Sequence, residues 1–192
     1  MIRLWRFLLV LSCSALLAAC VTPARIASTQ ADAQEFSRVG RFALTVTEAG
    51  SSPQATQGGF SWLDEGGQFT LDLTTPLGST QARVQGRPGL SVLTRANGEQ
   101  LSAPDPDALA EEALGSRVPV AGLRDWFQGR LAQQPAATSV QRDEQGRPTA
   151  FEQGGWRAVL SRYDDRGPQV LVLERQEPGR RIVLRLVVTN PS

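Results

Sequence analysis

The 192-residue sequence contains no histidine and no lysine, and it has only two cysteines. Without histidine the chain cannot form a Ser-His-Asp or Cys-His nucleophile or an HExxH zinc site, and it has no imidazole to act as a general base near neutral pH. These absences exclude the commonest classes of hydrolase. We therefore expect a protein that is not an enzyme and that binds no metal.

Charge is also balanced. The sequence has 20 basic residues, all of them arginines, and 19 acidic residues, which gives a formal net charge of +1. A nucleic-acid-binding protein would need a clustered basic excess, which is absent. Hydrophobic residues make up 41% of the chain, with 18 glycines and 12 prolines. This composition indicates one folded, turn-rich domain with a core of ordinary size.

The first twenty residues have the organisation of a secretory signal peptide. Arg3 and Arg6 precede an apolar stretch at 7–17, which is too short to span a membrane, since spanning needs about 20 residues. The sequence 17–20 reads Leu-Ala-Ala-Cys and resembles a bacterial lipobox. We expect cleavage of residues 1–19 and a mature chain that begins at Cys20; an ordinary signal peptide with a chance cysteine is the alternative.

The lipobox resemblance implies that the Cys20 thiol carries a diacylglyceryl group and that its amine carries a further acyl chain. Two or more acyl chains anchor a protein stably to a membrane. Val21 follows the cysteine where an Asp would imply retention at the inner membrane, so export to the outer membrane is expected. Cys13 lies in the removed segment, so the mature chain cannot form an internal disulfide.

After a polar tether at 20–35, the sequence predicts a single domain over 36–192. Apolar residues alternate with polar or small ones, which is typical of antiparallel strands with one solvated face. These strand segments are 42–46, 60–62, 69–73, 82–84, 156–163, 170–175 and 181–188. Turn sequences such as Asn97-Gly98 and Pro178-Gly179 separate or follow them.

Two helices interrupt the strands. Asp105 and Pro106 begin the first, and Gly115 ends it. The second is expected at 120–131, with an apolar stripe formed by Val120, Leu123, Trp126, Phe127 and Leu131. A single layer of about ten or eleven strands would curl, so we predict an incompletely closed antiparallel β-barrel whose open side is covered by short helices.

Several motifs resemble the LolB family of outer-membrane lipoprotein receptors in Gram-negative bacteria. They are the segments 58–62 (GGFSW), 71–79 (LDLTTPLGS), 118–120 (VPV), 123–130 (LRDWFQGR) and 155–156 (GW). The resemblance implies a half-open barrel with a helical lid. It also implies that the protein takes lipoproteins from a soluble periplasmic LolA-like carrier and inserts them into the inner leaflet of the outer membrane, facing the periplasm. The expected partners are therefore the carrier, lipoprotein cargo and membrane phospholipid, with the protein as a monomer and no cofactor beyond the lipid on Cys20.

A set of apolar residues on the strands and on the second helix has two interpretations. They could be ordinary core, or they could line a cavity for acyl chains, which requires walls without unmet hydrogen-bonding groups. In a half-open barrel the same inner face could be both the packed core and the wall of the cavity. The candidates are Phe42, Leu44, Trp62, Phe69, Leu71, Leu73, Leu123, Trp126, Phe127 and Trp156.

Charged residues are interpreted as surface. The acidic pairs Asp64-Glu65, Glu111-Glu112, Asp143-Glu144 and Asp164-Asp165 lie beside turns or in a helix, which favours solvated positions over a carboxylate active site. Arginines at outward strand positions are expected on the barrel exterior, where they could meet lipid head groups. These are Arg41, Arg83, Arg157 and Arg185.

The loop that follows the strand ending at Thr74 holds a single apolar side chain. Pro76 and Gly78 are turn residues on either side of Leu77, and the next strand begins near Thr80. A lone exposed leucine is common, but the family resemblance implies that this residue enters the membrane during insertion. The rival interpretation of the whole chain is a structural or assembly lipoprotein of the envelope with a filled core.

Overall fold

The computed structural model describes residues 35–189, which form one sheet of eleven antiparallel strands and two helices. The strands are β1 (Phe36–Glu48), β2 (Gln54–Glu65), β3 (Gln68–Thr74), β4 (Thr80–Arg87), β5 (Leu90–Arg95), β6 (Gln100–Ala103), β7 (Thr138–Arg142), β8 (Pro148–Gln153), β9 (Trp156–Asp164), β10 (Gly167–Glu177) and β11 (Arg180–Val188). The helices are α2 (Pro106–Leu114) and α3 (Val120–Trp126). No helix among these residues is long and apolar enough to cross a membrane.

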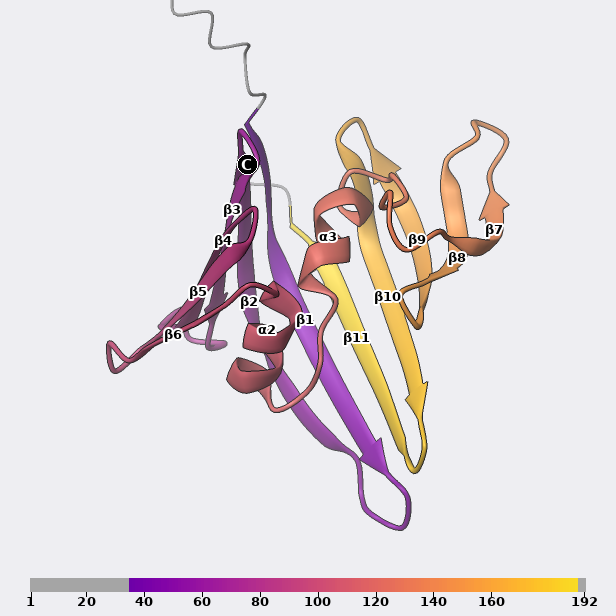
Figure 1. Cartoon of the computed structure of the whole chain (residues 1–192). Helices are drawn as coiled ribbons and strands as arrows, with labels where there is room; N and C mark the ends of the chain where they lie inside the picture. Colours follow the sequence, from indigo (N-terminus) through magenta and orange to yellow (C-terminus); the bar gives the residue numbers. More distant parts are fainter. Residues whose placement is uncertain (1–34, 190–192) are drawn as a thin grey trace, which may run out of the picture. The chain divides into compact units, whose positions relative to one another are not determined.

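The strands follow the order β6-β5-β4-β3-β2-β1-β11-β10-β9-β8-β7, so the first and last strands of the series do not pair and the sheet stays unclosed. Figure 1 shows both helices on one face of the sheet, and α2 packs there against β4, β5 and β6. We call this the inner face and the opposite one the outer face. The predicted half-open antiparallel barrel with a helical cover is confirmed.

Alternation along each strand divides buried from exposed side chains, as the period of two predicts. In β1 the inward Phe42 and Leu44 are 7% and 2% exposed, whereas the neighbouring Arg41 points outward and is exposed. The inward residues of nearly all strands join one core cluster with the apolar faces of α2 and α3. The helices therefore complete a core that the open sheet cannot close alone.

Two glycines on adjacent central strands make room for two phenylalanines. Gly40 pairs with Phe60, and Phe42 pairs with Gly58, so each ring crosses to a glycine on the neighbouring strand. A Cβ placed on Gly58 would lie 2.0 Å from the Thr74 carbonyl oxygen and 3.0 Å from the Phe42 ring. Only glycine fits here, and such aromatic-over-glycine pairs fix register where a sheet bends.

Helix α2 begins and ends where the sequence predicts. The Asp105 side chain accepts a hydrogen bond from the Asp107 backbone N–H at 3.0 Å, and Pro106 opens the helix. At the other end Gly115 adopts a left-handed conformation with φ of 67°, and its N–H donates to the Glu111 carbonyl. The cap residues thus fix the length of this helix.

Helix α3 is shorter than predicted, because it ends at Trp126 and not near Leu131. Gly129 has a φ of 68°, and the Arg130 backbone N–H donates to the Asp125 carbonyl at 3.0 Å, which turns the chain out of the helix. Phe127 is still fully buried, so it packs from the turn after the helix. The apolar spacing was correct for Val120, Leu123 and Trp126 but did not reveal this early end.

Candidate functional site

The loop between β3 and β4 presents one leucine to solvent. Leu77 is 95% exposed, far more than any other large apolar residue among those described, since Val39 follows at 41%. The strands on either side end at Thr74 and begin at Thr80, as the sequence predicts. A side chain this exposed contributes almost nothing to the core, so the fold itself does not explain its apolar character.

Hydrogen bonds across its base hold the loop in shape. The Thr75 N–H donates to the Ser79 carbonyl at 2.8 Å, and the Gly78 N–H donates to the Thr75 carbonyl at 2.9 Å. The Ser79 N–H also donates to the Thr75 hydroxyl at 3.1 Å. Gly78 has a φ of 90°, a backbone conformation that residues other than glycine rarely adopt. The loop is therefore a closed turn that holds Leu77 outward.

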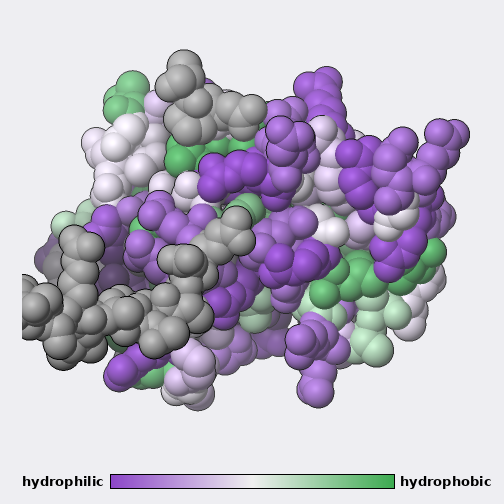
Figure 2. All heavy atoms as spheres, turned by 90° about the horizontal axis from the view of Figure 1, so that it is seen from above, coloured by the Kyte–Doolittle hydropathy of each residue, from purple (hydrophilic) through white to green (hydrophobic). Residues whose placement is uncertain are grey.

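The other end of β3 has a different character. Glu65 ends β2 next to the β2–β3 turn, and Asp165 and Arg166 lie in the β9–β10 turn; all three are exposed. Figure 2 views the molecule from above and shows mainly hydrophilic side chains there, with smaller apolar areas between them. The exposed leucine therefore lies at the opposite end of β3 from a predominantly polar surface.

The ten predicted cavity residues lie together on the inner face. Nine of them are buried members of the core cluster, and Phe69 is partly buried against it. Within the sheet, Trp62 stacks on Phe69 with ring centroids 4.8 Å apart. Phe127, in the segment after α3, contacts the sheet through Phe60 at 5.4 Å and Trp62 at 5.7 Å. Side chains of the sheet and of the lid thus form one continuous apolar interior.

An opening of about 470 Å³ leads toward this interior beside the Leu77 loop. Its buried apolar lining comes from Phe42, Leu73 and Ala82, and the half-buried Ala113 and Leu114 of α2 complete it. Exposed polar residues such as Gln57, Gln81 and Asn97 also line it, together with Pro76 of the loop. We call this opening the apolar mouth. Sequence reasoning missed it, because α2 and β3 are far apart in the chain.

Helix α3 is tied to the sheet by an ion pair. The Arg124 guanidinium donates to both carboxylate oxygens of Asp64, at 2.6 and 2.7 Å, and the Asp64 residue is only 7% exposed. Asp64 is therefore not a solvated surface residue, and the prediction for it was wrong. A bidentate arginine compensates the carboxylate for the hydration that burial removes.

Asp164 departs from its surface prediction in the same way, although less completely. It accepts two hydrogen bonds from Arg38, at 2.8 and 2.9 Å, and the Arg38 side chain is 2% exposed. This pairing, with further backbone N–H donors from Arg166 and Gly167, lowers the pKa of Asp164 to about 2. The ion pair joins β1 to the end of β9.

Gln153 anchors the segment that follows α3. Its side-chain oxygen accepts from the Trp126 indole N–H at 2.9 Å and from the Ala132 backbone N–H at 3.1 Å. Its amide donates to the carbonyls of Ala132 and Pro135, both at 2.7 Å. A 3% exposed glutamine thus binds the backbone of the segment at 132–135 and fixes it to β8. No sequence pattern indicated this role.

The four outward arginines lie on the exterior, as predicted. Arg83 donates to Asp72 at 2.6 and 2.8 Å. No group of three or more His, Cys, Asp or Glu suited to a metal ion occurs within residues 35–189. Cys20 and most of the predicted tether lie outside the described residues.

Comparison with known proteins gives a consistent result. The family model described as Outer membrane lipoprotein LolB matches residues 34–190. Outer-membrane lipoprotein LolB of Bordetella pertussis is 65% identical over 178 residues, which cover 92% of this chain and 88% of that protein. Outer-membrane lipoprotein LolB of Cupriavidus taiwanensis is 38% identical over 186 residues, covering 96% and 90%. A solved structure of a LolA superfamily protein from Nitrosomonas europaea aligns with a TM-score of 0.40 at 11% identity, over 81% of this chain and 87% of that chain.

Proposed function

The chain belongs to the LolB family of outer-membrane lipoproteins, and from this premise we propose that it receives lipoproteins from a soluble periplasmic carrier and inserts them into the inner leaflet of the outer membrane. The family is one of outer-membrane lipoproteins and not of enzymes. The observation that carries the proposal is the exposed Leu77 in a closed turn beside the apolar mouth. The entry for acyl chains and the residue that contacts the membrane lie side by side at one end of β3. This arrangement suits the transfer of a lipoprotein's acyl chains from the protein to the bilayer.

The acyl chains of the cargo enter through the apolar mouth and lie between the sheet and the helices. Chains of this kind offer no hydrogen-bond partner, so they require walls such as Phe42, Leu73 and Leu114. The deeper aromatic residues, Trp62, Trp126 and Phe127, are at most 2% exposed. Entry therefore requires α2 or α3 to move away from the sheet, and the cargo then replaces contacts between side chains.

Leu77, held outward by Pro76 and Gly78, touches the bilayer during delivery. Burying one leucine side chain is worth about 2 kcal/mol, which is too little to anchor a protein but enough to favour repeated contact. Because Thr75 and Pro76 also line the apolar mouth, that contact brings the opening against the lipid. Cargo then passes to the membrane without crossing open water.

The protein itself is held in place by lipid on Cys20. An S-diacylglyceryl group and an N-acyl chain give more than the two acyl chains that stable anchoring needs. The tether at 20–35 then lets the folded domain reach both the membrane surface and an arriving carrier. No cofactor is required for transfer, because no bond of the cargo is made or broken.

The test replaces the apolar tip with a charge. Leu77→Glu should leave the fold and the acceptance of lipoprotein from the carrier unchanged, but it should abolish delivery to liposomes. Val140→Glu, at a 37% exposed apolar residue of the edge strand β7, is the matched control and should deliver like the parent. Delivery by Leu77→Glu at the parental rate would refute the proposed role. A failure of the parent itself to accept lipoprotein would favour a structural lipoprotein instead.

A further inference from the structure

A groove of about 580 Å³ runs over the outer face of the sheet beside the Leu77 loop. Its lining comes from β1, β2 and β11 together with Thr75, Pro76 and Gly78 of the loop. The two residues that flank Leu77 are therefore part of the groove. The groove adjoins the apolar mouth, because Thr75 and Pro76 of the loop line both, but the mouth opens toward the inner face and the groove lies on the outer face.

Three small outward residues of β1 and β2 leave space for the groove. Ala43, Gly59 and Ser61 line it where larger side chains would fill the space. A Cβ on Gly59 would lie 2.5 Å from the Thr74 hydroxyl oxygen, so the backbone is closely approached here. The remaining lining includes Val39, which is 41% exposed, and the half-buried Val187.

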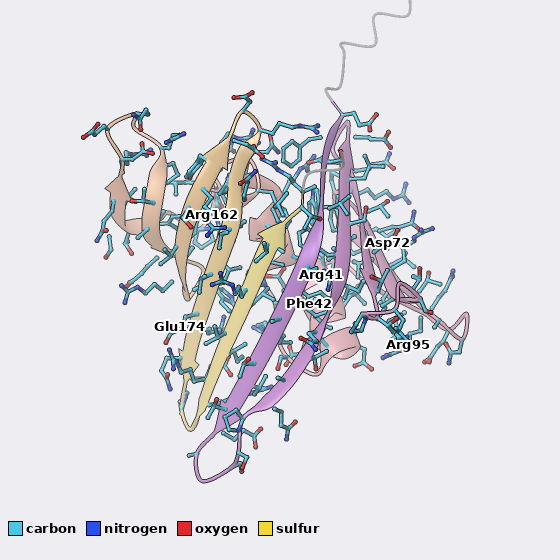
Figure 3. The ribbon with its side chains drawn as sticks, turned by 180° about the vertical axis from the view of Figure 1, so that it is seen from behind. Arg41, Phe42, Asp72, Arg95, Arg162 and Glu174 are labelled. Carbon is cyan, nitrogen blue, oxygen red and sulfur yellow. The ribbon has the colours of Figure 1, made fainter. Side chains whose placement is uncertain are left out.

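Two arginines lie in this groove without an acidic partner. In the β1–β11 ladder Arg41 pairs with Val187 and Ala43 pairs with Arg185, so the two arginines are diagonal neighbours on the outer face. Figure 3 shows that face, with Arg41 labelled on the central strands. Within residues 35–189 neither guanidinium forms a salt bridge.

Two acidic residues on the same face are already paired with other arginines. Asp72 pairs with Arg83 at 2.6 Å, and Glu174 pairs with Arg181 at 2.7 Å. Like charges on neighbouring strands repel each other, which makes an unneutralised arginine pair unfavourable. The arrangement is the one expected of a site that receives its negative charge from a ligand.

We propose that Arg41 and Arg185 bind the phosphate of an anionic membrane phospholipid while Leu77 enters the acyl layer beside it. Guanidinium groups match phosphate oxygens in geometry and charge, and two of them can share one phosphodiester. The exposed Val39 and the loop prolyl ring offer apolar contact to the glycerol and upper acyl region. A soluble anion would use only the arginines, whereas a phospholipid uses the arginines, the valines and the adjacent leucine together.

This inference rests on the proposed function, because it assigns a lipid class to the membrane contact of delivery. Leu77 alone supplies affinity for any bilayer, since an apolar side chain does not distinguish head groups. The arginine pair adds a preference for anionic lipid and fixes the angle at which the sheet meets the surface. The apolar mouth, next to the same loop, is thereby held toward the membrane.

The experiment measures binding of the mature chain, residues 20–192 with Cys20→Ala, to vesicles without any lipid anchor. The core and all strand pairings lie within the residues that this chain keeps. Vesicles of pure phosphatidylcholine are compared with vesicles that also contain phosphatidylglycerol. The variant is Arg41→Gln with Arg185→Gln, and the charge-matched control is Arg87→Gln with Arg157→Gln, two exposed arginines outside the groove.

An arginine near an anionic surface contributes about fivefold in binding, so the groove variant should bind phosphatidylglycerol vesicles about 25-fold more weakly than the parent. The control should lose much less, and neither variant should change binding to pure phosphatidylcholine. Inorganic phosphate at the same ionic strength as a chloride control should not displace the parent. Equal losses in both variants, or displacement by free phosphate, would overturn the inference.

The inference and the proposed function fail in different ways. If the groove variant keeps its vesicle binding while Leu77→Glu still abolishes delivery, the headgroup site is wrong and the transfer function stands. If the parent binds anionic vesicles through Arg41 and Arg185 but never accepts lipoprotein, the headgroup site stands and the transfer function is wrong. Because both arginines are exposed on the sheet exterior and repel each other, the variant should unfold at a temperature no lower than that of the parent.

Discussion

The Arg124 guanidinium of α3 and the Asp64 carboxylate of β2 form a bidentate ion pair at 2.6 and 2.7 Å, and this pair ties α3 to the sheet. A second polar contact, from the Trp126 indole to Gln153, holds the same helix toward β8. Helix α3 is thus attached to β2 and to β8, which lie in opposite halves of the sheet.

The first prediction concerns this ion pair. Arg124→Gln leaves the buried Asp64 carboxylate without a cation, so the free energy of unfolding should fall by about 1–3 kcal/mol. Amide hydrogen exchange over α3 should accelerate more than exchange over the central strands. Arg130→Gln, which breaks an exposed pair with Asp125, is the control and should cost less than about 1 kcal/mol. Equal effects of the two changes would show that the Asp64 pair holds α3 no more strongly than an exposed pair.

The second prediction concerns pH. Arg38 lowers the pKa of Asp164 from 3.8 to about 2, so the folded state favours the ionised carboxylate. The resulting stability is complete above pH 3.8 and is lost as the pH falls toward about 2. Asp164→Asn should remove this pH dependence of the free energy of unfolding. The expected change is about 1 kcal/mol, because solvent screens the charge of a partly exposed carboxylate.

Chemical unfolding at several pH values checks this prediction. The neighbouring Asp165→Asn, at an exposed residue, should keep the parental slope because Asp165 forms no salt bridge within residues 35–189. If Asp164→Asn and the parent lose stability in parallel through the acidic range, the Arg38 pair does not stabilise the folded state.

Much of the fold was predictable because the information is local. Alternation, caps and turn residues identified most strands, the ends of α2 and the turn at Leu77. The early end of α3 was not predictable from apolar spacing, since Phe127 and Leu131 continue the stripe after the helix stops. Gly129 was the available signal, because a glycine in a left-handed conformation often ends a helix.

The site was less accessible to sequence reasoning, because its parts meet only in the folded chain. Asp64 and Asp164 were interpreted as solvated, yet each is neutralised by an arginine far away in the sequence. The repeated pattern Gly40-x-Phe42 and Gly58-x-Phe60 could have indicated the register of β1 and β2. Nothing in the sequence showed that α2 would pack against β4, β5 and β6 and there line the apolar mouth.

The third prediction concerns the lipid anchor. In a Gram-negative host supplied with labelled palmitate, the parent chain should become labelled at Cys20 and should fractionate with the outer membrane. Cys20→Ala should carry no label. Cys13→Ala is the control, because Cys13 lies in the expected signal peptide, and it should be labelled like the parent. Equal labelling of the parent and Cys20→Ala would exclude Cys20 as the acylated residue.

The fourth prediction tests entry through the apolar mouth. Ala113→Trp should fill the opening from the α2 side, since Ala113 lines it and is only half-buried. The affinity for a fluorescent fatty acid should fall about tenfold, which corresponds to about 1.4 kcal/mol. Ala121→Trp, at an exposed position of α3 outside the mouth, is the matched control and should bind the probe like the parent.

A second variant separates blocked entry from a disturbed helix. Ala96→Trp fills the same mouth from the β5–β6 connection, where Ala96 is exposed and does not belong to the core. Loss of fatty-acid binding in both mouth variants, with thermal unfolding unchanged in Ala96→Trp, means that the chain enters between α2 and the Leu77 loop. Parental affinity in Ala96→Trp would instead place the entry elsewhere on the inner face, and absence of binding in the parent would mean that the interior stays filled.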